Sequence, residues 1–139
     1  MKNKMKVVLA DTDESFRMML QRMIEAAGDF RVVGSVGSGA DAWYVIEREC
    51  PQLVIMDVIL PELDGFGLLD RMAAMAARPR AILVSAFCQG QVVSRAMTQG
   101  AESFLPKPCE VNELLGQMRH VAQRAEAEDA RNAALERLV

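Results

Sequence analysis

Residues 52–65 read QLVIMDVILPELDG, an apolar run that ends in Asp57 and leads through a proline to Asp64 and Gly65. Such a short apolar run favours a strand that is buried on both faces, as strands are in a parallel sheet covered by helices. A carboxylate at the end of that strand is costly to bury unless it meets a cation or lies at the rim. The stretch therefore predicts a parallel sheet with an aspartate at one edge.

Strand-like runs and helix-like segments alternate along the rest of the chain. The other strand-like runs are MKVVLA (5–10), RVVGSV (31–36), RAILVS (80–85) and ESFLP (102–106). We expect helices that end before Gly28, that span about 38–49, 65–76 and 91–99, and that begin again near residue 110. This alternation predicts an α/β fold, a doubly wound parallel sheet of five strands built from five βα units.

These helices carry apolar residues that we expect to face the sheet, as the first and the fourth helix illustrate. The stripe of the first helix follows i, i+3, i+4 and i+7 spacing. Its members are Phe16, Met19, Leu20, Met23, Ile24 and Ala27. The stripe of the fourth helix consists of Val93, Ala96 and Met97.

The composition is that of an ordinary globular domain. The chain has 139 residues, 51% apolar and 25% charged, which suits one domain (1–121) and a helical tail or linker (122–139) rich in Ala, Glu and Arg. No apolar run approaches the ~20 residues of a membrane span, so we expect a cytoplasmic protein without membrane contact. The net charge of −3 and the lack of basic clusters argue against nucleic-acid binding by this chain. Three widely spaced cysteines without a CxxC pair are expected to be reduced thiols.

Five polar side chains follow the predicted strands at the edge where parallel strands end. Asp11 and Asp13 follow the first strand, Asp57 the third, Ser85 the fourth and Lys107 the fifth. Ligands of doubly wound sheets bind at this edge. Carboxylates suit a hard divalent cation, while a lysine and a serine suit phosphoryl oxygens. The group suits phosphoryl transfer to a carboxylate, although each residue alone also fits a cap, turn or surface role.

Three strings, in this order and spacing, resemble the receiver domains of two-component response regulators, the CheY-like family. IMDVILPELDG (55–65) is similar to the phosphoacceptor segment, ILVSAF (82–87) to the fourth strand with its Ser/Thr switch, and GAESFLPKP (100–108) to the fifth strand with its Lys-Pro. The resemblance covers about residues 5–121 and implies the flavodoxin-like strand order 2-1-3-4-5. It implies a signalling switch and not an enzyme, since such a domain catalyses only its own phosphorylation and dephosphorylation.

Carried over position by position, the resemblance implies a role for each residue. Asp57 would accept the phosphoryl group, Ser85 would hydrogen-bond a phosphoryl oxygen, and Lys107 would pair with it electrostatically. Phe104 would be an aromatic switch that turns inward when Ser85 moves. The implied donor is a histidine kinase or a phosphotransferase protein.

Residues 11–13, the loop after the first strand, depart from the family pattern, and we call this loop the acidic corner. The family has two adjacent acids after the first strand, whereas this chain has Asp11 followed by Thr12. The resemblance implies an Mg²⁺ site formed by Asp11, Asp57 and the backbone carbonyl of Ile59, weakened by the threonine. Asp13 is displaced by one residue, so it suits a helix cap and reaches the cation only if the loop bends.

The resemblance also implies an output. Phosphorylation would reshape the face made by the fourth helix, fifth strand and fifth helix, through which a homodimer can form. That face would control a transcriptional output domain that these 139 residues do not include. Residues 85–121 show a narrower resemblance to the receivers of sporulation phosphorelay transcription factors of spore-forming bacteria.

Two alternative interpretations stay open. DTDES (11–15) resembles the nucleophile motif of haloacid dehalogenase-type phosphohydrolases, with Asp11 as nucleophile and Asp13 as acid or base. That interpretation lacks the acidic pair expected after Lys107 and does not explain residues 55–65. The other alternative keeps the receiver fold as an interaction module that works without phosphorylation, because Thr12 weakens the metal corner.

Overall fold

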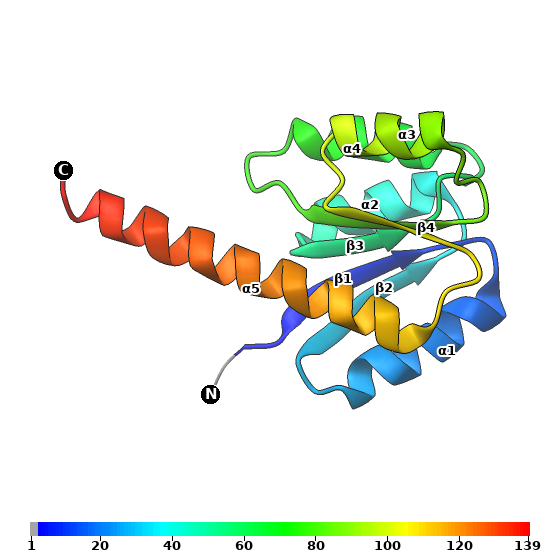
Figure 1. Ribbon diagram of the computed structural model, residues 1–139, viewed down its shortest axis with the longest axis horizontal. Coiled ribbons are helices and arrows are strands. Elements are labelled where there is room, and N and C mark those ends of the chain that lie inside the picture. The colour runs from blue at the N-terminus through cyan, green and yellow to red at the C-terminus, as the bar shows by residue number, and fades with distance from the viewer. Residues whose placement is uncertain (1–2) are drawn as a thin grey trace.

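The computed structural model describes residues 3–139, which form a five-stranded parallel sheet with the order β2-β1-β3-β4-β5 (Figure 1). The strands are β1 (Met5–Ala10), β2 (Phe30–Val36), β3 (Leu53–Met56), β4 (Arg80–Ser85) and β5 (Ser103–Pro106). The helices are α1 (Glu14–Ala26), α2 (Gly39–Glu49), α3 (Gly65–Ala73), α4 (Gly90–Thr98) and α5 (Val111–Glu136). The α/β fold and the strand order 2-1-3-4-5 are confirmed.

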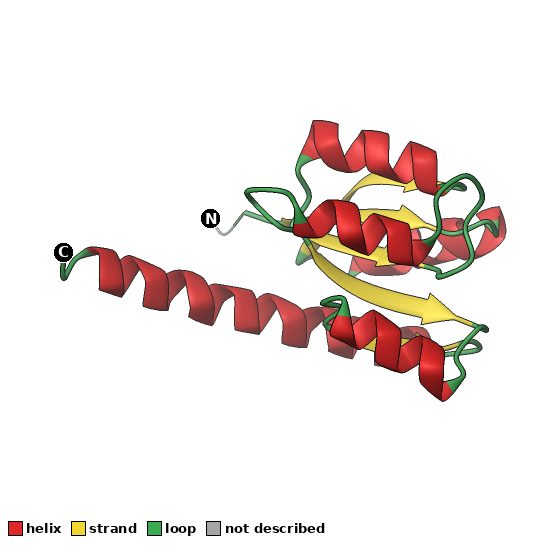
Figure 2. Cartoon of the chain, turned by 90° about the horizontal axis from the view of Figure 1, so that it is seen from above, coloured by secondary structure: helices red, strands yellow, loops and turns green. Residues whose placement is uncertain are grey.

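Helices cover both faces of the sheet, so the strands are buried from two sides (Figure 2). On one face, Leu20 and Ile24 of α1 and Met118 of α5 belong to one apolar cluster with Leu9 and Ile55 of the strands. On the other face, α2, α3 and α4 form a second cluster over the alternate strand residues. This two-sided burial explains why residues 53–56 are apolar without interruption.

The ends of the elements follow from local chemistry. β1 and β4 have the predicted bounds, 5–10 and 80–85. Asp13, Ser38 and Asp64 lie in extended backbone just before α1, α2 and α3, and the side chain of each accepts a hydrogen bond from the backbone N–H three residues later. These caps fix where the helices start beyond the carboxyl ends of the strands.

The predicted inward stripe of α1 is partly wrong. Leu20 and Ile24 are buried, but the side chains of Met19 and Met23 are 43% and 40% exposed. Residues four apart form one narrow line of contact with the sheet, and the two methionines lie on the flank of that line. The predicted stripe therefore includes more residues of α1 than actually contact the sheet, because apolar spacing alone does not separate the two groups.

The predicted inward stripe of α4 is also partly wrong. Val92 and Ala96 are the buried pair, whereas Val93 is half-buried and Met97 is 43% exposed. Val92 and Ala96 are four residues apart and so share one face. The neighbouring apolar residues lie on the side of the helix that the sheet does not cover.

Helix α5 is the longest element and extends well past the sheet (Figure 1). Its first half buries Leu114, Leu115, Met118 and Val121, whereas residues 126–139 are all exposed. The helix passes residue 121 without a break, and the domain boundary predicted there stays a prediction. Within residues 3–139, no helix combines the length and apolarity that a membrane crossing requires.

Charged side chains tie the second half of α5 to the edge of the sheet where the strands begin. Arg80, the first residue of β4, pairs with Glu102 at 2.8 Å and also with Glu128 of α5. Arg124 of α5 pairs with Glu102 at 3.1 Å. We call these four residues the α5 anchor.

Candidate functional site

The predicted site residues meet at the opposite edge, where the strands end. In the sheet, Met56 of β3 lies between Ala10 of β1 and Leu83 of β4. Asp57 therefore follows β3 beside the residue that follows β1, Asp11. The order of the strands reverses between β1 and β3, which is where ligands bind in doubly wound sheets.

Lys107 bridges the two aspartates. Its Nζ atom lies 2.6 Å from Asp11 Oδ2 and 2.8 Å from Asp57 Oδ2. The side chains of Asp11 and Asp57 are only 7% and 11% exposed, while that of Lys107 is 23% exposed. The two nearly buried carboxylates are thus neutralised in part by one ammonium, which leaves the three groups with a net charge of about −1.

Hydrogen bonds hold the other oxygen of Asp57. Oδ1 accepts from Ser85 Oγ at 2.5 Å and from the backbone N–H of Ile59 at 3.1 Å. The hydroxyl oxygen of Ser85 also accepts from the backbone N–H of Phe87 at 3.1 Å. The carboxylate is therefore fixed from both sides, and Ser85 links it to the loop that leads into α4.

The ammonium of Lys107 stays charged at neutral pH. Partial burial lowers the pKa of this group, but the hydrogen bonds and charges of Asp11 and Asp57 outweigh burial and raise the pKa above its ordinary value. The ring of Phe16, on α1, lies 5.0 Å from Nζ and adds a cation–π contact. Lys107 is thus suited to pair with an added anion at this edge.

The acidic corner has one carboxylate in the site and one at the helix cap. Asp13 Oδ1 accepts from Phe16 N at 3.1 Å, so its side chain caps α1. The backbone N–H of Asp13 donates to Asp11 Oδ1 at 2.9 Å. Thr12 is exposed. Asp11 is therefore the residue of this loop that faces Asp57 and Lys107.

The donor set fits a hard divalent cation with few protein ligands. Among residues 3–139 no three acidic, histidine or cysteine side chains group as a metal cluster. Asp11 and Asp57 both reach the same ammonium, so their oxygens converge on one small volume. Mg²⁺ keeps several waters and needs only one or two carboxylates, so these two residues are compatible with it.

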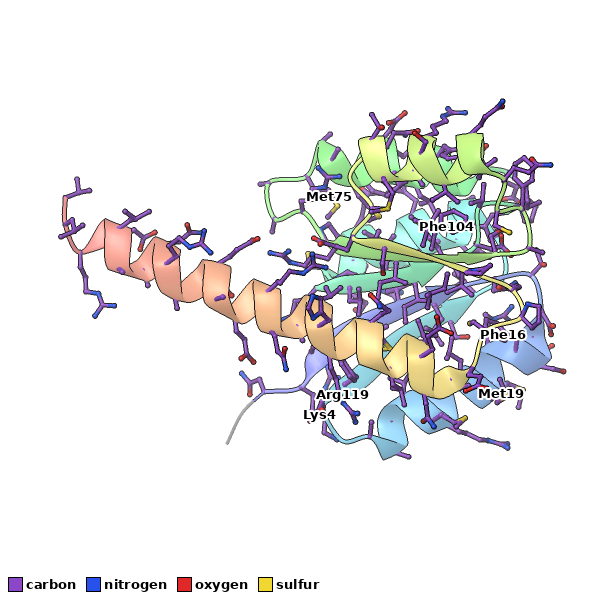
Figure 3. The ribbon with its side chains drawn as sticks, viewed as in Figure 1. Lys4, Phe16, Met19, Met75, Phe104 and Arg119 are labelled. Carbon is purple, nitrogen blue, oxygen red and sulfur yellow. The ribbon has the colours of Figure 1, made fainter. Side chains whose placement is uncertain are left out.

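Two further residues predicted at the site lie around it. Ile59 is 57% exposed and follows Asp57 in the loop before α3. Gly65 begins α3 against this loop, where its N–H donates to Val58 O at 2.8 Å and an added Cβ would lie 2.8 Å from Asp57 O. Phe104 is half-buried on β5 against the α4 side of the core, while Phe16 lies on the α1 side (Figure 3).

The sequence did not reveal that two residues of α1 reach the site. The spacing of Phe16 predicts only a place in the apolar stripe, yet its ring also lies beside Lys107. Arg17 had no predicted role, yet its Nη1 donates to the backbone carbonyl of Asp11 at 2.5 Å. The sequence of an amphipathic helix does not show whether one of its arginines contacts a backbone carbonyl or lies in solvent.

The cysteines of the chain form no disulfide bonds within residues 3–139. All three cysteines are free, and Cys88 and Cys109 are half-buried. Burial, and then the charge of Glu113, raises the pKa of the Cys109 thiol. That direction disfavours the thiolate and agrees with a packing role for this residue.

Comparison with known proteins identifies the class of this domain. Residues 7–119 match the family described as response regulator receiver domain, and the chain belongs to that family. The structure is similar to the signal receiver domain of the putative response regulator NarL from Mycobacterium tuberculosis, with 28% identity over 88% of this chain and 98% of that chain and a TM-score of 0.83. It is similar to the signal receiver domain of a putative Luxo repressor protein from Vibrio parahaemolyticus, with 26% identity over 92% and 97% of the two chains and a TM-score of 0.85. A third similar structure is the response regulator domain of Thermotoga maritima CheB, with 27% identity, 86% and 96% coverage and a TM-score of 0.78.

Proposed function

We propose that this receiver domain accepts a phosphoryl group on Asp57 from a phosphohistidine or phosphoaspartate donor protein. One observation carries the proposal. The Asp57 carboxylate lies at the ligand edge of the sheet, between Lys107 Nζ at 2.8 Å and Ser85 Oγ at 2.5 Å. A positioned carboxylate with an ammonium and a hydroxyl beside it is what phosphoryl transfer to an aspartate requires.

In the transfer from phosphohistidine, a carboxylate oxygen of Asp57 attacks phosphorus and a new O–P bond forms. The P–N bond of the donor breaks, its electron pair stays on the imidazole nitrogen, and that nitrogen takes a proton from water. Lys107 pairs with the charge on the phosphoryl oxygens, and Ser85 can donate its hydroxyl to one of them. In dephosphorylation, water attacks phosphorus, the O–P bond to Asp57 breaks, and the carboxylate and inorganic phosphate are released. The domain would catalyse only these two reactions of its own aspartate.

Mg²⁺ is the proposed cofactor. Asp11, Asp57 and the backbone carbonyl of Ile59 would hold it, and when bound it supplies positive charge to the phosphoryl oxygens. Asp13 is the weakest candidate ligand because its carboxylate caps α1. With Thr12 in place of a second acid, we expect weaker Mg²⁺ binding than two adjacent acids would give.

The signal would leave the site through Ser85. Its hydroxyl oxygen holds the N–H of Phe87, so a phosphoryl group that takes over the Ser85 hydroxyl would move the loop before α4. Phe104, half-buried beneath α4, would then turn inward. The resulting population shift would reshape the face of α4, β5 and α5, which we propose as the homodimer face and the control point for a transcriptional output domain.

Receiver domains interact with kinases or phosphotransfer proteins, and a histidine kinase or phosphotransferase is the proposed donor here. The narrower resemblance to sporulation phosphorelay receivers stays a prediction, as do cytoplasmic location and the lack of nucleic-acid binding. The family match does not favour the hydrolase alternative. The capping role of Asp13 supports the same view, because its carboxylate is engaged by a backbone N–H and not aimed at Asp57 or Lys107.

The test is intact-mass analysis after incubation with acetyl phosphate across an Mg²⁺ titration. The parent chain should gain one phosphoryl group in an Mg²⁺-dependent manner. Asp57→Asn should gain none, and Asp11→Asn should gain one only at higher Mg²⁺. No adduct at any Mg²⁺ concentration would favour the phosphorylation-independent module, and turnover that survives Asp57→Asn but is lost with Asp11→Asn would favour the hydrolase.

A further inference from the structure

Arg17 of α1 contacts the acidic corner from behind. Its guanidinium donates from Nη1 to the backbone carbonyl of Asp11 at 2.5 Å and from Nε to Ser35 Oγ at 3.0 Å. These partners lie just past the end of β1 and near the end of β2, so one planar group ties three elements together. A guanidinium makes such a pair of bonds with less loss of freedom than an ammonium does.

The end of β2 packs beside this contact at ordinary van der Waals separations. An added Cβ at Gly37 would lie 3.4 Å from Arg17 Nη1 and 3.9 Å from the Asp11 carbonyl oxygen. The backbone N–H of Asp11 donates to Val36 O at 3.1 Å. Both backbone polar groups of Asp11 are therefore held, one by β2 and one by Arg17.

A fixed backbone matters because Asp11 faces two partners at once. Its Oδ1 accepts from Asp13 N at 2.9 Å, and its Oδ2 accepts from Lys107 Nζ at 2.6 Å. Thr12 carries no carboxylate and that of Asp13 caps α1, so neither supplies a second acid if Asp11 turns away. The orientation of this loop's acidic group thus rests on the backbone of one residue.

We propose that Arg17 is a positioning residue that orients Asp11 for cation binding by holding its backbone carbonyl. The inference rests on the proposed function, because it concerns the same Mg²⁺ site. Within residues 3–139, the side-chain hydrogen bonds of Arg17 go to Ser35 and to the backbone carbonyl of Asp11, so Arg17 acts on the cation site through Asp11.

The sign of the effect separates positioning from charge. Arg17 is a cation close to a cation site, so by electrostatics alone its removal would tighten Mg²⁺ binding. If Arg17 positions Asp11, its removal loosens the carboxylate and weakens Mg²⁺ binding instead. Loss of a residue that orients a metal ligand typically costs 10- to 100-fold in affinity.

The experiment measures the dissociation constant for Mg²⁺ by titration calorimetry on the whole 139-residue chain. Arg17→Gln should weaken binding by roughly tenfold. Arg17→Lys keeps the charge and one donor, so it should lie between the parent and Arg17→Gln. Arg22→Gln, an exposed position on the same helix with the same change in charge, is the matched control and should leave the affinity close to that of the parent.

A second readout needs no metal. The amide of Asp13 donates to Asp11 Oδ1, so its hydrogen exchange should become several-fold faster in Arg17→Gln without Mg²⁺, while urea unfolding shows that the variant is folded. Unchanged or tighter Mg²⁺ binding in Arg17→Gln would overturn the inference. If the parent bound no Mg²⁺ and gained no phosphoryl group, the proposed function would fail, and the exchange of the Asp13 amide would still decide whether Arg17 positions Asp11.

Discussion

At each edge of the sheet one basic residue pairs with two acidic ones, but the acidic side chains are more exposed at the amino edge, where Arg124 adds a second cation. At the carboxyl edge, Lys107 lies between Asp11 and Asp57, whose side chains are 7% and 11% exposed. At the amino edge, Arg80 lies between Glu102 and Glu128, and Glu128 is 51% exposed. A basic residue between two acidic ones therefore occurs twice in this domain, once with nearly buried acids and once with a more exposed acid.

The difference in burial sets what each cluster can do. Water reaches the α5 side of the anchor, where Glu128 and Arg124 are 51% and 44% exposed, so the ion pairs made by these two residues add little to stability and hold mainly the direction of a helix. The charges at the carboxyl edge have lost most of their water, so they depend on one another and on any ion that joins them. The carboxyl-edge cluster is buried and has a net negative charge, so it is suited to binding a cation. The exposed pairs of the α5 anchor can open and close more easily.

The largest expected effect comes from removing the buried cation. Lys107→Met leaves Asp11 and Asp57 facing each other without a counter-ion, and should lower the free energy of unfolding without Mg²⁺ by about 2 kcal/mol. The measurement is urea unfolding at neutral pH. The matched variant Lys6→Met removes a lysine at the other edge, and an equal loss there would contradict the special role of burial.

A second expected effect is that the difference in free energy of unfolding between the parent and Lys107→Met depends on pH. The pKa of Lys107 is raised in the folded chain, so its stabilising contribution is complete below the unfolded pKa of about 10.4 and is lost as pH rises through the still higher folded pKa. The stability difference between the parent and Lys107→Met should stay constant across neutral pH and, as pH rises further, shrink in strongly alkaline solution. A difference that shrinks already near neutral pH would contradict the raised pKa.

The smallest effect is expected at the α5 anchor. Arg80→Gln should speed hydrogen exchange of the α5 amides beyond residue 121 by roughly two- to fivefold and leave the exchange of the sheet unchanged. High salt should remove the difference from the parent, because exposed pairs are screened. Arg137→Gln serves as the control, since this exposed residue follows the last turn of α5 and lies outside the anchor. Faster exchange throughout the domain would instead give the anchor a global role.

Much of the fold was predictable because its signals are local. The apolar runs at 5–10 and 80–85 coincide with β1 and β4, and the helix expected over about 38–49 is α2, with Ser38 as its cap. The convergence of Asp11, Asp57, Ser85 and Lys107 followed from topology alone, since residues that follow parallel strands share one edge. The side-chain contacts among them join residues that lie 28 to 96 positions apart along the sequence.

Other features depend on tertiary contacts that leave no local signal. Met19 fits the apolar spacing of α1 as well as Leu20 does, and only the placement of the sheet separates them. The pair of Arg80 and Glu128 joins residues 48 positions apart, so an Ala- and Glu-rich tail showed no sign of attachment. The contact of Arg17 with a backbone carbonyl is likewise independent of any side-chain pattern.

Because α5 is long, a small rotation at its first turn displaces its far end by a large distance. The helix begins four residues after Lys107 and continues for 26 residues, or about 39 Å at 1.5 Å per residue. An angular change of about 10° at its first turn would displace the far end by roughly 7 Å if the helix moved as a straight rod. The pairs of Glu128 with Arg80 and of Arg124 with Glu102 oppose that swing, so the displacement of the far end depends on whether these two pairs are closed or open.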